Sequence, residues 1–169
     1  MTTTKAPKKT TRAKTVKVQP EVLPRNPFVF EVLDLVSRQR SKPKKIQVLK
    51  KYEDISLKSV LIWNFDQSII SVLPAGEVPY NVNDAPAGTE HTSLEHESRL
   101  FFHFIEGGNQ NLTKSKRENM FIQLLEGLHK DEANVLCMVK DKKLGKRYKV
   151  TKAAVAEAFP QINWGGRSQ

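Results

Sequence analysis

The chain has 169 residues, enough for one domain with a buried core, and its 28 Lys and Arg against 18 Asp and Glu give a formal net charge of +10. Such a balance says nothing about fold but favours a polyanion as the partner. One cysteine, Cys137, cannot form an internal disulfide; it lies in the apolar run VLCMV, so we expect a buried thiol in a reducing, cytosolic setting. No segment approaches the roughly 20 apolar residues of a membrane helix. No basic amphipathic helix with an exposed apolar face stands out either, so nucleic acid is favoured over a membrane as the partner.

Residues 1–24 are predicted to be a disordered basic tail. The first 20 residues hold six Lys and Arg, no acid and almost nothing to bury. Basic arms of this kind add sequence-independent affinity for nucleic acid, and a merely solubilising tail is the alternative. The segment lacks the apolar core of a secretory signal. Its acid-free, Thr-rich composition is shared with transit peptides, but we favour a solvated tail.

Three short helices are predicted in the first half of the chain. Asn26 can cap and Pro27 can open the first, Pro43 can start the second, and Asp54 or Ser56 can cap the third. Their apolar residues recur at helical spacing. The residues expected to face the core are Phe28, Val32, Leu35, Val36, Ile46, Leu49, Leu57, Val60, Leu61 and Phe65.

Prolines, glycines and asparagines punctuate residues 69–91 too often for a regular element, so we expect a long loop there. Four helices should follow, starting at Thr92 with a capping box, at Thr113, at Asp131 and at Thr151. Expected stops are Gly107-Gly108 and Phe159-Pro160, and the expected core residues are Leu94, Phe101, Phe104, Ile105, Phe121, Leu124, Leu125, Leu128, Val135, Leu136 and Val139.

The fold class is therefore predicted to be all-α. We expect a single compact domain of six or seven helices over residues 25–163, followed by a flexible C-terminus over residues 164–169. Charge is segregated along this domain. Residues 77–106 hold six acids against one base, whereas residues 138–152 hold seven bases against one acid. Such segregation is typical of a protein with one face for a polyanion.

The basic stretch around Gly145 is the most informative part of the sequence. It predicts an apolar helix end, a basic turn centred on the glycine, and a Thr-capped helix halted by Pro160. A glycine lets the backbone approach a ligand, helix-start N–H groups attract anions, and lysines contact phosphates. The candidate nucleic-acid-binding residues are Lys142, Lys143, Gly145, Lys146, Arg147, Lys149, Thr151 and Lys152, with Lys44, Lys45, Thr113, Lys114 and Arg117 extending the track from two other helix starts.

Motifs for catalysis are absent from the sequence. No Walker or GxGxxG glycine loop occurs, no Ser/His/Asp set is identifiable, and His96-Glu97 fails the HExxH spacing because position 100 is leucine. We expect His91, His96 and His103 to be surface or packing residues. Phe101, Phe102 and Phe104 could stack on bases, but core positions are favoured, and Trp63 and Trp164 stay undecided. No enzyme activity, metal, cofactor or small-molecule substrate is expected.

Residues 131–162, DEANVLCMVKDKKLGKRYKVTKAAVAEAFPQI, resemble the N-terminal, all-helical DNA-binding domain of ATP-dependent DNA ligases, especially the compact phage version. That family has an apolar helix, a D-L-x-x-G turn and a short helix closing on an aromatic-Pro pair. Asp141, Leu144, Gly145, Phe159 and Pro160 occupy those points here, although Leu144 directly precedes the glycine. Residues 28–51 and 112–117 resemble the family collinearly. The chain is also similar to small uncharacterised proteins of large cyanobacterial and marine tailed phages.

The resemblance implies a DNA-gripping domain without its catalyst. Ligases carry a Lys-x-Asp-Gly nucleophile motif, and the dipeptide Asp-Gly occurs nowhere in this sequence. In ligases the domain holds duplex DNA across the minor groove beside the nick, mainly through backbone contacts. We therefore expect sequence-independent binding of double-stranded DNA, nicked or intact, by an accessory factor in phage DNA replication, repair or recombination, in the cytoplasm of an infected bacterium.

The alternative is a phage interaction or virion-associated protein that reuses a ligase-like helical scaffold. Its contact surface would be the acidic, Pro-rich loop over residues 69–91. A replisome subunit or a host protein would bind there, with Val72, Leu73, Val78 and Tyr80 as apolar anchors.

Overall fold

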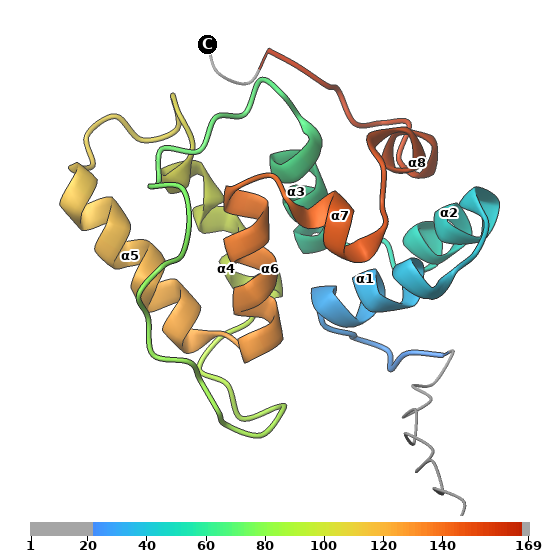
Figure 1. Cartoon of the computed structure of the whole chain (residues 1–169), viewed down its shortest axis with the longest axis horizontal. Helices are drawn as coiled ribbons and strands as arrows, with labels where there is room; N and C mark the ends of the chain where they lie inside the picture. Colours follow the sequence, from blue (N-terminus) through green and yellow to red (C-terminus); the bar gives the residue numbers. More distant parts are fainter. Residues whose placement is uncertain (1–21, 167–169) are drawn as a thin grey trace, which may run out of the picture.

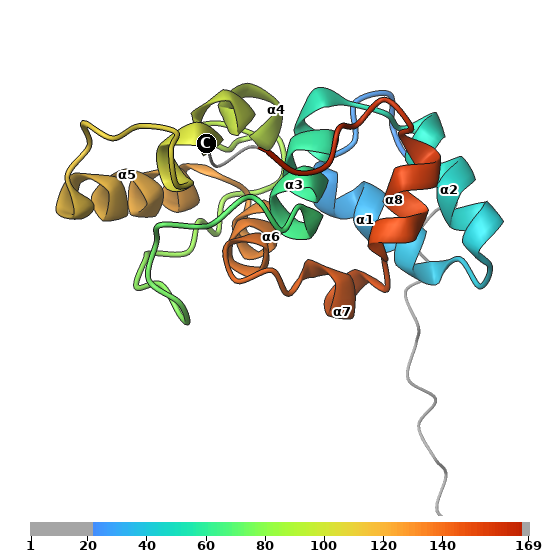
Figure 2. The same cartoon turned by 90° about the horizontal axis from the view of Figure 1, so that it is seen from above.

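A computed structural model describes residues 22–166, so residues 1–21 of the predicted tail and residues 167–169 lie outside it (Figures 1 and 2). Over the described range the chain forms eight α-helices, one 3₁₀ helix (η1) and a single isolated antiparallel bridge, which confirms the all-α class. The elements are α1 (Val29–Arg38), α2 (Lys42–Lys51), α3 (Ile55–Phe65), α4 (Leu94–Glu97), η1 (Ser98–Phe104), α5 (Lys114–Gly127), α6 (Lys130–Lys140), α7 (Leu144–Tyr148) and α8 (Lys152–Ala158).

Three helix starts lie where the sequence predicts them, because a short polar side chain satisfies a free amide of the first turn. The Asp54 carboxylate accepts from the amide of Ser56 at 2.8 Å and starts α3. The hydroxyls of Thr113 and Thr151 accept likewise at the starts of α5 and α8.

Three other predicted caps are wrong by one or two residues. At α1 the Glu31 carboxylate accepts from the N-cap amide at 2.9 Å, so the cap needs no polar side chain of its own. At α6 an imidazole nitrogen accepts from the amide of Asp131 at 3.1 Å and replaces the predicted acid. The N-cap residues of α1, α4 and α6 are Phe28, Ser93 and His129, where Asn26, Thr92 and Asp131 were predicted.

The helix predicted from Thr92 is one turn of α-helix, α4, continued by the 3₁₀ helix η1. In a 3₁₀ helix residues three apart share a face, so Phe101 and Phe104 both enter the core. Phe102 lies between them and points away, with 46% of its surface exposed.

The basic turn predicted around Gly145 contains a further short helix, α7. Leu144 and Tyr148, four residues apart on one face, are both buried and pull this segment onto the domain. The chain reverses at two lysines rather than at the glycine, because Lys142 and Lys149 adopt φ values of 56° and 54°.

An aromatic stack joins α3, η1 and α5 in the core. The Trp63 ring lies 5.2 Å from the Phe101 ring and 6.3 Å from the Phe104 ring, and Phe104 meets Phe121 edge-on at 5.2 Å. The indole N–H of Trp63 donates to the hydroxyl of Ser71 at 2.8 Å, so its polar atom is satisfied. Trp63 is thereby settled as a core residue.

The helices divide the domain into two ends (Figures 1 and 2). Helix α2 packs on α1 and α8, and α7 packs on α1 and α6. Helix α5 packs on α6 and η1 at the opposite end of the molecule from α2 and α8, and both views agree on this. This division decides which basic segments lie together.

The packed region is slightly longer at each end than the predicted 25–163. The amide of Leu23 donates to the Tyr52 hydroxyl at 3.1 Å, and Leu23 packs on the core. Trp164 also packs on the core, and the amide of Gly165 donates to the Asp66 carboxylate at 3.1 Å, so these residues are fixed rather than flexible. No helix among residues 22–166 is both long and apolar enough to cross a membrane.

Candidate nucleic-acid interface

Two of the three predicted basic segments meet in space. The Lys45 ammonium on α2 donates to the main-chain carbonyl of Lys149, in the connection between α7 and α8. One turn earlier on α2, Lys42 pairs with Glu157 of α8 at 2.6 Å. The contacts of α2 with α8 therefore bring Lys44 and Lys45 beside the C-terminal basic stretch.

Six bases of that stretch are exposed, and five of them form, with Lys44, the surface that we call the basic end. Arg147 lies over the Tyr148 ring at 4.8 Å and 3.9 Å from Asp34 of α1, so one acid partly offsets its charge. Lys152 lies over the Trp164 ring at 5.1 Å. The members of the basic end are Lys44, Lys143, Lys146, Arg147, Lys149 and Lys152.

Two other lysines of the stretch bond to main-chain carbonyls of the protein; Lys140 is buried, whereas Lys142 is exposed. Lys140 has no exposed side chain, and its ammonium donates to Pro74 O at 2.7 Å, Gly76 O at 3.0 Å and Asp141 Oδ1 at 2.8 Å. Lys142, predicted to meet phosphate, donates to Trp63 O at 3.1 Å and Asp66 O at 2.7 Å.

The carbonyls that Lys142 contacts belong to the C-terminus of α3, where a cation is favoured by the free carbonyls and the helix dipole. Burial lowers the pKa of Lys142, and the Asp66 carboxylate opposes that effect. Its ammonium therefore caps a helix, and we no longer expect it to face a ligand.

The structure gives a packing reason for a glycine at position 145. It lies inside α7 rather than at a hinge, and a Cβ there would come within 2.9 Å of Val150 O and 3.4 Å of the Phe65 ring. Only glycine lets the chain on either side of Tyr148 pack this closely. The predicted close approach is therefore to the protein's own backbone, and the prediction of a ligand contact at Gly145 is withdrawn.

Thr151 uses its hydroxyl to cap α8, accepting from the amide of Ala154 at 3.2 Å. Helix α8 has only seven residues, so the predicted anion contact at its first amide gains little from a helix dipole. We therefore give the main role at this corner to the charged side chains.

The third basic segment lies apart, at the start of α5. Lys114 is exposed, 3.9 Å from Glu118, and Thr113 caps the helix. Arg117 donates from Nε to His103 O at 2.8 Å and from Nη2 to the carbonyls of Asn109 and Leu112, both at 3.1 Å. The predicted phosphate contact by Arg117 gives way to an internal bond network, and Thr113 and Lys114 are not part of the basic end.

Sequence reasoning also left out bases that belong near the interface. Arg38, the last residue of α1, and Arg40, in the turn before α2, are exposed, and Arg38 lies one helical turn beyond Asp34, the acid beside Arg147. Lys42 follows in α2. The signal was present in the basic link SRQRSKPKK, but the packing of α1 on α7 was needed to place it.

The apolar anchors proposed for the loop over residues 69–91 are mostly internal. Leu73 is buried, Val78 and Tyr80 pack on the core, and Lys140 holds the loop by two carbonyls. The amide of Asn81 donates to Glu126 of α5 at 2.9 Å. This loop is pinned to the domain at these points, although Ile70 and Val82 within it are about half exposed.

The sequence profile of a family of unknown function, DUF6433, matches residues 32–146, more than half of the chain. The chain belongs to the DUF6433 family. No curated protein and no solved structure matches it. The DUF6433 match starts within α1 and ends within α7, so it includes Lys44, Lys143 and Lys146 but not Arg147, Lys149 or Lys152.

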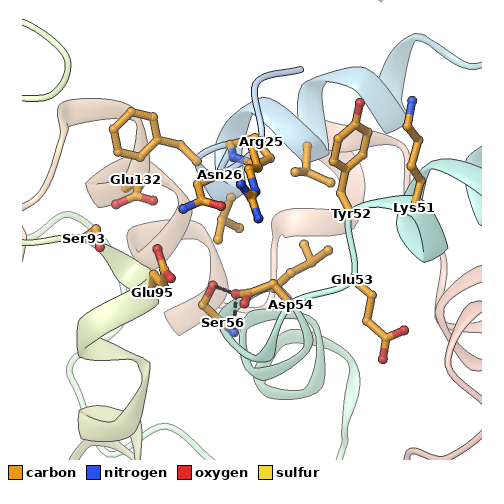
Figure 3. A pocket seen from close by; sticks show the side chains of 15 residues that line it. Arg25, Asn26, Lys51, Tyr52, Glu53, Asp54, Ser56, Ser93, Glu95 and Glu132 are labelled. Carbon is orange, nitrogen blue, oxygen red and sulfur yellow. Dashed lines mark hydrogen bonds between the residues drawn. The ribbon is translucent and has the colours of Figure 1, made fainter. Parts of the chain in front are cut away.

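A polar hollow of about 220 Å³ lies where the starts of several helices meet (Figure 3). Glu132 of α6, 1% exposed, accepts from the amide of Leu94 at the start of α4 at 3.0 Å. Burial raises the pKa of Glu132 to about 7. Asp54, on the opposite wall, accepts from Ser56. These carboxylates satisfy helix amides, so the hollow has a structural explanation.

Metal-binding clusters do not emerge among residues 22–166. No group of three or more His, Cys, Asp or Glu in that range could hold a metal ion. The three histidines of residues 91–103 stay apart: His96 pairs with Ser93 at 2.8 Å and His103 with Asn109 at 2.9 Å. The candidate site therefore remains the group of exposed bases at the basic end.

Proposed function

We propose that this DUF6433 protein binds double-stranded DNA through the basic end, without catalysing a reaction and largely without reading sequence. The supporting observation is the meeting of α2 with the α7–α8 connection, through the Lys45–Lys149 bond, which gathers Lys44, Lys146 and Lys149 from distant parts of the chain. Clustered exposed bases attract a phosphate backbone by releasing its counterions.

The biological setting rests on the resemblance to phage ligase domains alone. It is an accessory role in phage DNA replication, repair or recombination inside an infected bacterium. The alternative, a protein–protein or virion role through the loop over residues 69–91, has less support, because the residues offered as its anchors pack against the domain.

Charge reversal at α7 tests the proposal. Lys146→Glu with Arg147→Glu should weaken binding to a blunt, fluorescein-labelled duplex by roughly tenfold or more at low salt, because both exposed side chains would then repel phosphates. Polarisation titrations measure this, and circular dichroism checks the fold.

The matched control is Lys114→Glu with Lys116→Glu, which makes the same charge change on exposed residues of α5, at the other end. It should leave the affinity for blunt duplex nearly unchanged. Equal losses in both variants, or no binding by the unmodified protein at low salt, would contradict the proposal.

A further inference from the structure

The end of the molecule that carries α5 presents one exposed aromatic ring, Phe102. Its neighbours in η1, Phe101 and Phe104, are buried, whereas 46% of Phe102 is exposed. The ring lies against the imidazole of His103, with centroids 3.9 Å apart and planes 35° from parallel. We call this pair of rings the platform.

The loop after η1 holds the platform in place. Gly108 lies so close to Phe102 that a Cβ at position 108 would be 1.8 Å from the Phe102 carbonyl oxygen, so no other residue fits there. The side chain of Asn109 bonds to Nδ1 of His103 at 2.9 Å. The loop therefore packs against the backbone of Phe102 and orients the His103 ring.

Arg117 fastens this loop to α5. Its guanidinium donates to His103 O in η1 at 2.8 Å. It also donates to the carbonyls of two loop residues, Asn109 and Leu112, both at 3.1 Å. An aromatic side chain that is already held in place loses little conformational entropy on binding. The position of the ring is thus set before any ligand arrives.

Positive charge follows the platform along the chain, at the start of α5. Leu112, fastened to Arg117, is followed at once by Thr113 and α5, whose first turn carries the exposed Lys114 and Lys116. The Lys114 side chain is 77% exposed, and Glu118, 3.9 Å away, offsets part of its charge. The amides at the start of this 14-residue helix favour an anion too.

We propose that Phe102 is the stacking surface for one unpaired base of a nucleic acid whose backbone passes the start of α5 at Lys114 and Lys116. Every base offers a flat face, and stacking on an aromatic ring tolerates any sequence. In a continuous duplex the faces of the bases are covered by their neighbours, so the platform selects a strand that has left the duplex. The inference rests on the proposed function and adds single-strand preference to it.

The test compares a blunt duplex with the same duplex carrying a single-stranded overhang of about ten nucleotides, long enough to reach across a domain of this size. The unmodified protein should bind the overhang substrate several-fold more tightly. Phe102→Ala should lower the affinity for the overhang substrate by roughly tenfold and leave the blunt duplex unaffected. Phe102→Trp should keep the preference, with its added fluorescence quenched on binding.

Ile55→Ala removes another exposed apolar side chain, at the start of α3, and should change neither affinity. Equal binding of both substrates by the unmodified protein would overturn the platform proposal, as would a preference that survives in Phe102→Ala. Failure of the duplex proposal is separately visible as loss of blunt-duplex binding at low salt. Binding of a free single strand that depends on Phe102 would still support the platform in that case.

Discussion

At the scale of single residues, the polar hollow of Figure 3 shows how buried charge serves the fold. Glu132 sits in the first turn of α6 and bonds to the start of α4, so one carboxylate ties two helix N-termini together. Helix dipoles favour an anion there, but burial penalises it. The balance raises its pKa to about 7, with Glu90 and Glu31 acting in the same direction.

This balance predicts a pH dependence of stability. The pKa of Glu132 rises from the model-compound value of 4.5 to about 7 on folding, so between these values the native state binds more protons than the unfolded state. The contribution is therefore full below pH 4.5 and is lost as pH rises through 7. At 1.36 kcal/mol per unit it amounts to at most about 3 kcal/mol.

Denaturant unfolding at intervals between pH 4.5 and 8.5 measures the loss. Glu132→Gln keeps an oxygen acceptor for the amide of Leu94 but cannot ionise. Its free energy of unfolding should vary less over this range and should exceed that of the unmodified protein at pH 8. Parallel pH profiles for the two proteins would show that Glu132 does not titrate in this way.

At the scale of elements, short helices are held by capping from distant side chains. Helix α3 ends against the ammonium of Lys142, which arrives from the turn before α7. That lysine adopts a positive φ, and its side chain reaches the carbonyls of Trp63 and Asp66, the second of which also accepts from the amide of Ile69. The turn and the helix end thus stabilise each other.

Removing this cap should destabilise the fold. Lys142→Met deletes the two hydrogen bonds at the C-terminus of α3 and should lower the free energy of unfolding by about 1–2 kcal/mol. Lys143→Met, a change to the exposed neighbour, should cost less than about 0.5 kcal/mol. Thermal or denaturant unfolding measures both, and equal effects would refute a specific cap.

At the scale of the whole molecule, two groups of exposed bases lie at opposite ends. The basic end combines α2 with α7 and α8, while Lys114 and Lys116 belong to the first turn of α5, a helix that packs on η1. A duplex held at one end and a separated strand passing the other would use both groups at once.

The number of phosphates engaged at the basic end can be counted from salt dependence. For duplex DNA the logarithm of the binding constant falls with the logarithm of salt concentration by roughly 0.9 per phosphate contact. The reversal of Lys146 and Arg147 should reduce that slope by about two units on blunt duplex. Reversal of Lys114 and Lys116 should leave it unchanged. A slope that is the same in all three proteins would remove the basic end from the interface.

Local patterns determined much of the fold in advance. Helix periodicity and capping residues such as Asp54, Thr113 and Thr151 specify their elements through contacts a few residues apart, and those starts are confirmed. The 3₁₀ character of η1 and the helix α7 were missed. Each depends on burying side chains against remote elements, as Leu144 and Tyr148 do.

The sequence by itself established that the chain is helical, basic and divided into charged segments, because composition and periodicity are properties of the chain alone. Only the tertiary structure decided which charges remain available. Lys140 is buried against carbonyls inside the domain, Lys142 bonds to carbonyls at the C-terminus of α3, and Lys146 of the same stretch is exposed. Arg117 fastens a loop and Gly145 packs on a carbonyl. The sequence shows which residues are charged, but the packing of the helices decides whether each charged side chain contacts the protein itself or faces the solvent.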